Sequence, residues 1–496
     1  MNLAHLIDDH DADRAALISR GRTTTYGALR DQVAHLRGGL RAHGVGPGDA
    51  VALLCGNGRY FVVSYLAIIG LGAVAVPLNP TSPAAEIERQ LATVKAVCVV
   101  IEPAAKQAWR GVDRGAVPAL VTVVCTEGDD LDGAVSMASL LDAAEVDIVE
   151  VADDHVALLM FTSGTAGSPR AAMLSHGNLL SNLAQGESAT ERIGPDDVVF
   201  GVLPMFHIFG LNVVLGLTLD RGATLVLVQR FDPSTALDTI RERGVTVLPG
   251  APPLWIAFSH MDDAPVDSFA SVRLALTGAA KMPEAAMRRL AKRFGLELSE
   301  GYGLTEASPV VTSSAGMRAR FGSVGKVLRG IEVRLVDESG DDALDGDPGE
   351  IWVRGPNVFL GYLDDPEQTA RVLTTDGWLR TGDIATVDTD GYLHLVDRAK
   401  DLIIVSGFNV YPAEVEEVLA EHPGVGEVGV IGVPHPHSGE AVKAFVVPLP
   451  GVHLDEDQLI AWCCDHLARY KAPTKVLFVD ELPRNLSGKL LRRSLT

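Results

Sequence analysis

The sequence predicts an α/β protein of layered, mostly parallel sheets, followed by a β-rich subdomain and a compact α+β domain. Three observations predict this class. Strand-like apolar runs alternate with amphipathic helical runs over residues 25–300. Short strand-like runs separated by glycine, proline and aspartate turns fill residues 322–396. From residue 397 onwards helices and strands mix again in a segment long enough to fold independently.

The first helix is predicted to start after Thr25, which can cap it, and to be closed by Gly44. Leu29, Val33, Leu36 and Leu40 fall on one face of this helix. Another helix is predicted to follow Ser82 as its cap, with Pro83 at its first position. The strands predicted in this part of the chain are residues 50–54, 95–101, 120–124 and 155–161.

Residues 61–78 form an apolar stretch that resembles a membrane span. Gly70 and Gly72 interrupt it and Pro77 ends it, so it predicts a buried helix followed by a short strand over residues 73–76. Peripheral contact with a membrane stays open on this interpretation.

Beyond residue 162 the alternation resumes. Asp232 and Pro233 predict a helix start, and another helix is predicted over residues 283–294. The strands expected here are residues 171–174, 223–228, 245–248, 272–277 and 296–299. The β-rich subdomain is expected to hold strands at 332–336, 349–353, 384–387 and 392–396. The last domain is expected to hold helices at 412–420 and 455–467 and strands at 428–433, 442–447 and 476–479.

Charge and cysteine content limit the function. The formal net charge of −22 argues against a nucleic-acid partner, which would need a basic surface. ATP binding stays compatible, because one local cation can serve a phosphate chain. The five cysteines are odd in number and form no C-x-x-C pair, so they predict reduced thiols and a cytoplasmic protein. Residues 1–9 have neither a basic region nor a long apolar core, and predict no signal peptide.

The stretch that suggests chemistry first is residues 162–170, which read T-S-G-T-A-G-S-P-R after a predicted strand. Small residues let backbone N–H groups face an anion, hydroxyls add donors, and the arginine offsets negative charge. The stretch therefore predicts a phosphate cradle. Its spacing differs from the nucleotide loop G-x-x-x-x-G-K-[ST], and an ordinary surface turn has a similar composition.

Further stretches point in the same direction. Residues 203–210 place His207 among aromatic side chains, and residues 301–306 form a glycine turn ending in Glu306, a hard oxygen ligand suited to Mg²⁺. The others are residues 381–383 with 397–401, which offer a carboxylate and a guanidinium to sugar hydroxyls, and the basic loop 483–489. Each alone has a simpler explanation, such as a core histidine, an exposed ion pair or a mobile tail. Those explanations do not account for all of them in this order.

In this set of motifs the chain resembles the adenylate-forming (AMP-binding) superfamily, in its fatty-acyl-CoA synthetase branch. The resemblance extends from about residue 25 to residue 489. It implies a large N-terminal domain, residues 1–396, of layered α/β sheets with a β-barrel-like subdomain over 322–396. It also implies a small mobile α+β C-terminal domain over residues 397–496.

The resemblance implies roles for individual residues. The catalytic residues would be Lys489, His207, Thr305 and Glu306, and Glu306 would also hold Mg²⁺. The residues that would bind ATP or CoA are Thr162, Ser163, Gly164, Thr165, Arg170, Gly278, Ala279, Ala280, Gly301, Tyr302, Gly303, Asp383, Arg398, Lys400, Ser406 and Gly407. The acyl pocket would include Phe206, Phe209, Trp255 and Leu304.

The phosphate loop departs from the usual family pattern T-S-G-T-T-G-x-P-K-G. Ala166, Arg170 and Ala171 replace Thr, Lys and Gly. Arg170 keeps the charge on a bulkier, planar group, and Ala171 restricts backbone angles that glycine would allow.

The stretch around His207 resembles the fatty-acyl branch, because residues 206–210 contain no aspartate to hold a substrate ammonium. The predicted reaction joins a medium- or long-chain fatty acid to CoA through acyl-AMP, using ATP and Mg²⁺ and releasing pyrophosphate and AMP. Three alternatives stay open: an acyl-AMP ligase, an aryl-acid CoA ligase, and a catalytically inactive ATP-binding protein.

Overall fold

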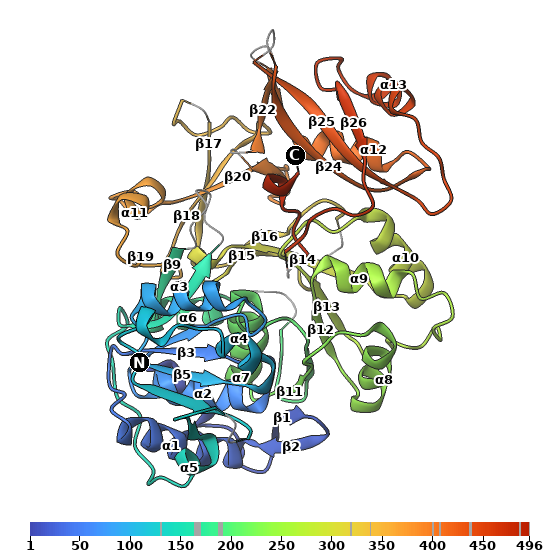
Figure 1. The fold of residues 1–496 in the computed structure, drawn as a ribbon. Coiled ribbons are helices and arrows are strands. Elements are labelled where there is room, and N and C mark those ends of the chain that lie inside the picture. The colour runs from blue at the N-terminus through green and yellow to red at the C-terminus, as the bar shows by residue number, and fades with distance from the viewer. Residues whose placement is uncertain are drawn as a thin grey trace. The chain divides into compact units, whose positions relative to one another are not determined.

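The structure is a computed structural model, and it confirms the α/β class with a large N-terminal sheet region and a smaller C-terminal part (Figure 1). It describes residues 1–128, 131–162, 170–186, 192–317, 320–337, 339–398, 401–405, 408–435, 439–485 and 488–495. Within these ranges, no helix is both long enough and apolar enough to cross a lipid bilayer.

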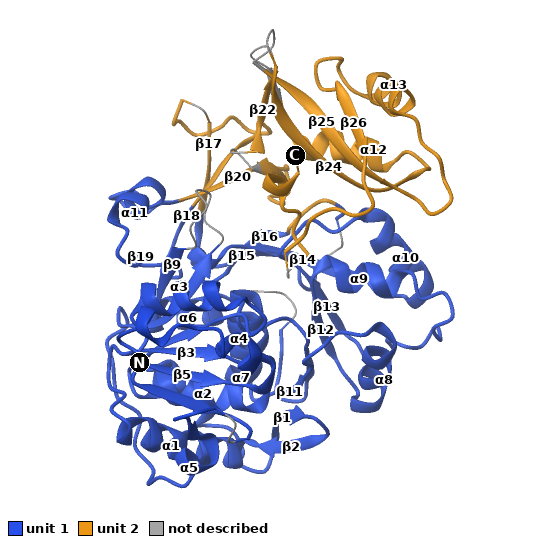
Figure 2. Cartoon of the chain, viewed as in Figure 1, with its two compact units in different colours: residues 1–321, 325–332, 353–379 blue, residues 322–324, 333–352, 380–496 orange. Residues whose placement is uncertain are grey.

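The chain forms two compact units, coloured separately in Figure 2. Unit 1 comprises residues 1–321, 325–332 and 353–379. Unit 2 comprises residues 322–324, 333–352 and 380–496, and so combines much of the β-rich segment with the C-terminal residues. The domain boundary expected at residue 397 stays a prediction.

An eight-stranded sheet forms the first half of unit 1, in the order β19-β9-β8-β4-β3-β5-β6-β7. The strands from β8 to β7 are parallel, whereas β9 and β19 are antiparallel to their neighbours. Their bounds are β3 Ala50–Leu54, β4 Val74–Pro77, β5 Cys98–Ile101, β6 Thr122–Cys125, β7 Val135–Ser136, β8 Val156–Thr162, β9 Arg170–Ser175 and β19 Gly361–Tyr362.

Helices cover this sheet because its central strands are buried at every position. Successive residues point to opposite faces, so both faces need a cover. Ala52 and Leu54 of β3 pack in one core with Ile87 and Leu91 of α3. Each buried leucine or isoleucine contributes roughly 1.5–3 kcal/mol to the hydrophobic stabilisation. The helices and short turns here are η1 Leu3–Ile7, α1 Tyr26–Ala42, α2 Arg59–Gly70, α3 Ala84–Val94, η2 Pro103–Ala105, α4 Lys106–Trp109, η3 Arg114–Ala116 and α5 Met137–Leu141.

The predicted helix starts are confirmed in part. The Thr25 hydroxyl accepts a hydrogen bond from the backbone N–H of Ala28, and the apolar stretch after residue 58 forms α2 and β4. The prediction that Ser82 caps α3 is wrong. Pro83 itself occupies the cap position of α3, because its fixed φ of −65° and extended ψ end the preceding turn without a side-chain hydrogen bond.

A nine-stranded sheet forms the second half of unit 1, in the order β16-β15-β14-β13-β12-β10-β11-β1-β2. Its strands are β1 Ala15–Ser19, β2 Arg22–Thr25, β10 Val198–Gly201, β11 Thr224–Leu227, β12 Val247–Gly250, β13 Leu274–Thr277, β14 Leu298–Gly303, β15 Val310–Ser313 and β16 Lys326–Val327. The helices and turns of this half are α6 His176–Gly186, the π-helix Phe209–Gly216, α7 Leu217–Asp220, α8 Pro233–Arg243, α9 Pro252–Ser259, α10 Glu284–Phe294 and η5 Thr305–Ala307. Helix α11 Pro366–Val372 instead contacts β19 of the eight-stranded sheet.

The core of this second half lies between the sheet and helices α8, α9 and α10. Trp255 and Phe258 of α9 are fully buried there, against Leu248 of β12 and Leu290 of α10. The sheet therefore presents the carboxyl ends of its parallel strands β12, β13 and β14 on a rigid support. Open α/β sheets bind ligands at such an edge.

Unit 2 contains a four-stranded sheet in the order β17-β18-β20-β21. It also contains a five-stranded sheet, in which four strands follow the order β23-β22-β25-β24 and β26 pairs with β25. The core of the second sheet joins Val442 and Val446 of β25 to Val415 of α12 and Leu459 of α13. The elements are β17 Glu332–Val336, β18 Gly349–Arg354, β20 Leu379–Val387, β21 Leu393–Arg398, β22 Ile403–Val405, β23 Phe408–Val410, α12 Pro412–Ala420, β24 Val425–His435, β25 Gly439–Pro448, α13 Glu456–His466, β26 Lys475–Phe478 and η7 Arg492–Ser494.

Candidate active site

The predicted phosphate loop connects two antiparallel strands. Thr162 ends β8, Arg170 begins β9, and the two residues are register partners. Ser163, Gly164 and Thr165 lie outside the described residues, as does Ala166, so the predicted cradle itself stays a prediction. Ala171 lies within β9 opposite Phe161. Its backbone is therefore that of an ordinary strand, and the glycine of the family pattern is not required there.

In unit 1, the side chain of Tyr362 contacts both Arg170 and Glu306. The Arg170 guanidinium is 5.8 Å from the centre of the Tyr362 ring, and its Nε is 3.3 Å from Oδ2 of Asp365. The Tyr362 hydroxyl donates a hydrogen bond of 2.7 Å to Oε1 of Glu306. Burial, followed by the charge of Glu306, raises the pKa of Tyr362, which keeps this donor protonated. Thus a cation and a carboxylate, both predicted to serve ATP, share a tyrosine that the sequence did not indicate.

The turn that carries Glu306 follows β14 and returns at once as β15. Gly303 is required here, because a Cβ atom at this position would lie 2.1 Å from the carbonyl O of Pro309. Leu304 N donates to the same carbonyl, and Thr305 opens the short turn η5. Gly303 is exposed, while Leu304, Thr305 and Glu306 are half-buried, so this edge is open to a ligand.

Three side-chain amides form hydrogen bonds with the backbone of this turn. Asn212 Nδ2 donates to the carbonyl O of Ser308 at 2.7 Å, and Asn357 Nδ2 donates to that of Ala307 at 2.8 Å. Asn182 both donates to and accepts from the backbone of Val310. All three amides are buried, and leaving such a group unpaired costs about 1–3 kcal/mol. The position of Glu306 is therefore fixed before any ligand binds.

The segment with His207 is fixed by Asn57, from the connection between β3 and α2. Asn57 Nδ2 donates to the carbonyl groups of Gly201 and Leu203 at 3.0 and 2.8 Å, and its Oδ1 accepts from Met205 N at 3.0 Å. Phe206 and His207, which follow at once, are half-buried. A satisfied, buried amide thus positions the two residues predicted to meet the acyl group.

Phe209 begins the π-helix, and its ring lies close to Gly278. A Cβ atom on Gly278 would lie 3.3 Å from Cε1 of Phe209 and 3.4 Å from the carbonyl O of Gly301. Gly278 therefore lies beside two residues that come from distant parts of the sequence. The neighbouring Ala279 is exposed at φ +70°, a left-handed conformation that is uncommon for alanine and is found most often at functional sites.

Trp255 is fully buried in the core of α8, α9 and α10, and its indole N–H is 3.2 Å from the carbonyl groups of Gly250 and Leu276. It supports the strands that end at Gly278. Its role as a wall of the acyl pocket stays a prediction. Tyr302, expected to stack on adenine, is 8% exposed, and Ala280 is half-buried.

A cavity of about 90 Å³ lies against β13, where Leu274 and Leu276 line it. Its apolar lining includes Val213 and Leu217 from the π-helix and α7, and Arg192 also borders it. An apolar cavity of about 150 Å³ holds a benzene molecule, so this one has room for only a few methylene groups.

Glu300, just before Gly301, is a buried carboxyl group that sequence reasoning missed. Burial raises its pKa to about 7, although Lys281 and the backbone N–H of Met282 oppose the shift. Since the unfolded carboxyl ionises near its ordinary pKa, the unfolded state releases its proton at lower pH than the folded state does. The protonated Glu300 therefore makes its full contribution to the free energy of unfolding below the unfolded pKa. This contribution is lost as the pH rises towards 7.

We expect Glu300→Gln to raise the free energy of unfolding at pH 8 by about 2–3 kcal/mol and to change it little at pH 4.5. The reason is that glutamine removes the buried charge that forms at high pH. Urea unfolding at both pH values measures the difference. Glu297→Gln, at an exposed position of the same segment, is the matched control. An equal effect of Glu300→Gln at both pH values would contradict this account.

The remaining predicted residues lie in unit 2. Asp383 of β20 is 6% exposed and is the register partner of Arg398 in β21, so the predicted ribose-binding pair shares one ladder. Lys489 is half-buried near the C-terminus. Lys400, Ser406 and Gly407 lie outside the described residues.

The residues around Glu306 fit Mg²⁺ bound in the manner expected for a nucleotide complex. Within the described ranges, no group of three His, Cys, Asp or Glu side chains could hold a metal ion by itself. Magnesium, however, binds through one or two carboxylates together with substrate phosphates. Glu306 offers a fixed, half-buried carboxylate for that purpose.

Comparison with known proteins defines the class. The AMP-binding enzyme family matches residues 7–363, and the AMP-binding enzyme C-terminal domain matches residues 414–489. The chain belongs to this family, the adenylate-forming superfamily, as its motifs predicted.

Individual relatives indicate the class of reaction. A feruloyl-CoA synthase from an Amycolatopsis species is 40% identical over 95% of this chain and 93% of its own length. A long-chain-fatty-acid–CoA ligase from Yersinia pestis is 36% identical over 98% of this chain and 91% of its own length. A crystal structure of ATP-bound MatB from Rhodopseudomonas palustris matches with a TM-score of 0.92 at 33% identity, over 100% of this chain and 98% of that one. At the level of reaction class the chain is an AMP-forming acid–CoA ligase.

Proposed function

We propose that this chain is an ATP-dependent acid–CoA ligase whose acid carries an aromatic or other flat ring, as hydroxycinnamic acids do. The observation that carries the proposal is the close approach of the Phe209 ring to the backbone of Gly278 opposite Gly301. Glycine at position 278 lets the Phe209 ring lie against the main chain, and a flat acid can stack on such an aromatic ring. The 40% identity to a feruloyl-CoA synthase supports the same class of acid. A ring-bearing acid replaces the fatty acid as the first choice.

In the first step, a carboxylate oxygen of the acid attacks the α-phosphorus of ATP, and pyrophosphate leaves with the electrons of the broken P–O bond. Glu306 would hold Mg²⁺, which supplies charge neutralisation at the phosphates. Lys489 would neutralise the charge that develops between the carboxylate and the α-phosphate, and Thr305 would donate a hydrogen bond there. His207 would line the acyl pocket beside the reacting carboxylate.

In the second step, the sulfur of CoA attacks the acyl carbon of the adenylate. The acyl C–O bond breaks, AMP leaves with that electron pair, and the thiol loses its proton. Thiol access to the acyl carbon would require Lys489 to withdraw, and rotation at Lys400 would provide it. Ser406 and Gly407 would then line the path of the pantetheine arm.

A second candidate is a medium- or long-chain fatty acid. The cavity against β13 favours it, because its lining is largely apolar. At about 90 Å³ this cavity holds only part of a long chain.

The test is an acid panel with ATP, Mg²⁺ and CoA, containing ferulate, 4-coumarate, benzoate, octanoate and palmitate. We expect kcat/KM for the best ring-bearing acid to exceed that for the best fatty acid by about tenfold or more. The reverse order would favour the second candidate. Thiol-independent release of AMP would indicate an acyl-AMP ligase, and nucleotide binding without pyrophosphate release would indicate an inactive ATP-binding protein.

A further inference from the structure

The C-terminal segment that carries Lys489 is packed onto unit 2. Leu482 and Leu495, on either side of the lysine, are buried against Phe445 of β25. Gly429 of β24 makes room for them, since a Cβ atom there would lie 3.1 Å from Leu495 Cδ1 and 3.0 Å from Leu490 Cδ2. Both ends of the segment are therefore anchored on the same sheet.

The backbone of Lys489 is fixed by one asparagine. Lys489 N donates to Oδ1 of Asn485 at 2.8 Å, and Asn485 N donates to the carbonyl O of Lys489 at 2.9 Å. Gly488 N donates to the carbonyl O of Asn485, also at 2.9 Å. These reciprocal bonds bring Asn485 back to Gly488 and Lys489, and so fix the backbone of this lysine-bearing turn.

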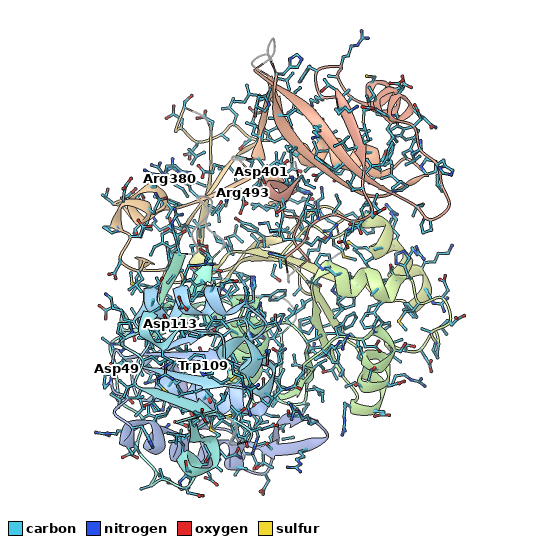
Figure 3. The ribbon with its side chains drawn as sticks, in the orientation of Figure 1. Asp49, Trp109, Asp113, Arg380, Asp401 and Arg493 are labelled. Atoms are coloured by element: carbon cyan, nitrogen blue, oxygen red, sulfur yellow. The ribbon has the colours of Figure 1, made fainter. Side chains whose placement is uncertain are left out.

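Arg492 joins this turn to two other elements. Its Nη2 donates to both carboxylate oxygens of Glu416 in α12, at 2.8 and 2.7 Å, and its Nε donates to the carbonyl O of Val430 at 3.2 Å. Its Nη1 is 3.4 Å from Oδ2 of Asp401. Figure 3 labels Asp401 and Arg493, the residue that follows Arg492.

The Arg492 contacts differ in kind from a surface ion pair. The Arg492 and Glu416 side chains are only 20% and 18% exposed, whereas Arg484 and Glu427, which pair at the other side of the turn, are 41% and 48% exposed. Exposed pairs contribute little, but a largely buried guanidinium whose Nη2 bonds both oxygens of a carboxylate, and whose other nitrogens bond two further groups, is held in place. Arg492 also reaches Asp401, which immediately follows Lys400, the predicted hinge.

We propose that Arg492 is a positioning residue for Lys489: it ties the lysine-bearing turn to α12 and to the residue after the predicted hinge, so that the three move as one body. The proposal rests on the proposed function of Lys489 in adenylation. It predicts that Arg492 matters for the step that needs the lysine in place and not for the step from which the lysine withdraws.

The experiment measures the two half-reactions separately in Arg492→Ala, Arg492→Lys and Glu416→Gln. Acid-dependent exchange of pyrophosphate into ATP reports adenylation, and AMP release from preformed acyl-adenylate with CoA reports thioester formation. We expect Arg492→Ala to slow adenylation by about 10²-fold, because a displacement of about 1 Å at a catalytic group has that effect, and to leave thioester formation within about threefold. Arg492→Lys should restore adenylation only in part, because a single ammonium cannot reach Glu416, the carbonyl O of Val430 and Asp401 together as the guanidinium does.

Lys475→Ala is the matched control, because Lys475 also forms an ion pair in unit 2, with Glu456 at 3.1 Å. It should leave both half-reactions and the melting temperature near those of the unaltered protein. Equal loss of both half-reactions in Arg492→Ala, full adenylation in that variant, or the same split in Lys475→Ala would each overturn the proposal. A wild-type protein that exchanges no pyrophosphate with any acid would instead contradict the proposed function, so the two failures are distinguishable.

Discussion

Lys489→Ala is expected to slow adenylation by about 10²–10³-fold, because a preorganised cation at a developing charge is worth several kcal/mol in a catalytic site. The carboxylate and the triphosphate are both anions, so their approach needs local positive charge. Unit 1 offers Arg170, but that guanidinium already lies near Asp365 and over Tyr362. In the proposed mechanism the Lys489 ammonium supplies this charge at the reacting carboxylate. Pyrophosphate exchange measures the loss.

The same variant should form thioester from supplied acyl-adenylate and CoA at a rate within about threefold of the unaltered protein, since the lost interaction acts only in the first transition state. Lys475→Ala, which removes a lysine that is 54% exposed on β26, is the control for loss of positive charge in unit 2. Parallel loss of both half-reactions in Lys489→Ala would show that the lysine does not act in the first step alone.

Glu306→Gln is expected to lower the adenylation rate by about 10²-fold or more and to raise the Mg²⁺ concentration needed for half-maximal rate, since a neutral amide is a poorer ligand for this cation. Glutamine has nearly the same shape and can still accept the hydrogen bond from Tyr362, so the turn should stay in place. Titration of pyrophosphate exchange with Mg²⁺ measures both quantities.

Two further variants separate charge from position. Tyr362→Phe removes only the donor to Glu306 and should lower the rate by about tenfold, the order of magnitude of one hydrogen bond to a charged group. Glu367→Gln, on the exposed face of α11, removes a carboxylate that pairs with Arg371 and should change neither rate nor Mg²⁺ dependence. An unchanged Mg²⁺ requirement in Glu306→Gln would exclude this carboxylate as a ligand.

Motifs predicted the class and the family because local chemistry and periodicity carry that information. The hydroxyl-rich stretch was placed correctly after a strand, and the turn ending in Glu306 was placed correctly at a strand's carboxyl end. Gly278, assigned to the nucleotide site on resemblance alone, lies close to Phe209 and to the carbonyl O of Gly301, and its role stays a prediction.

The support of the site could not be predicted, because it consists of contacts between residues far apart in the chain. Asn57 fixes a segment about 145 positions later, and Tyr362 reaches Glu306 across 56 positions. Asparagine and tyrosine occur singly, without a spacing that marks them. The π-helix after Phe209 was likewise missed, because an apolar run of eight residues gives the same pattern in several conformations.

The buried amides beneath the Glu306 turn have a practical consequence for anyone redesigning the choice of acid. Asn182, Asn212 and Asn357 each satisfy a main-chain group that water cannot reach, so a randomised library that includes them would return mostly unfolded clones. The side chains of Phe206 and Phe209 form no hydrogen bonds, so a library should randomise these two positions instead.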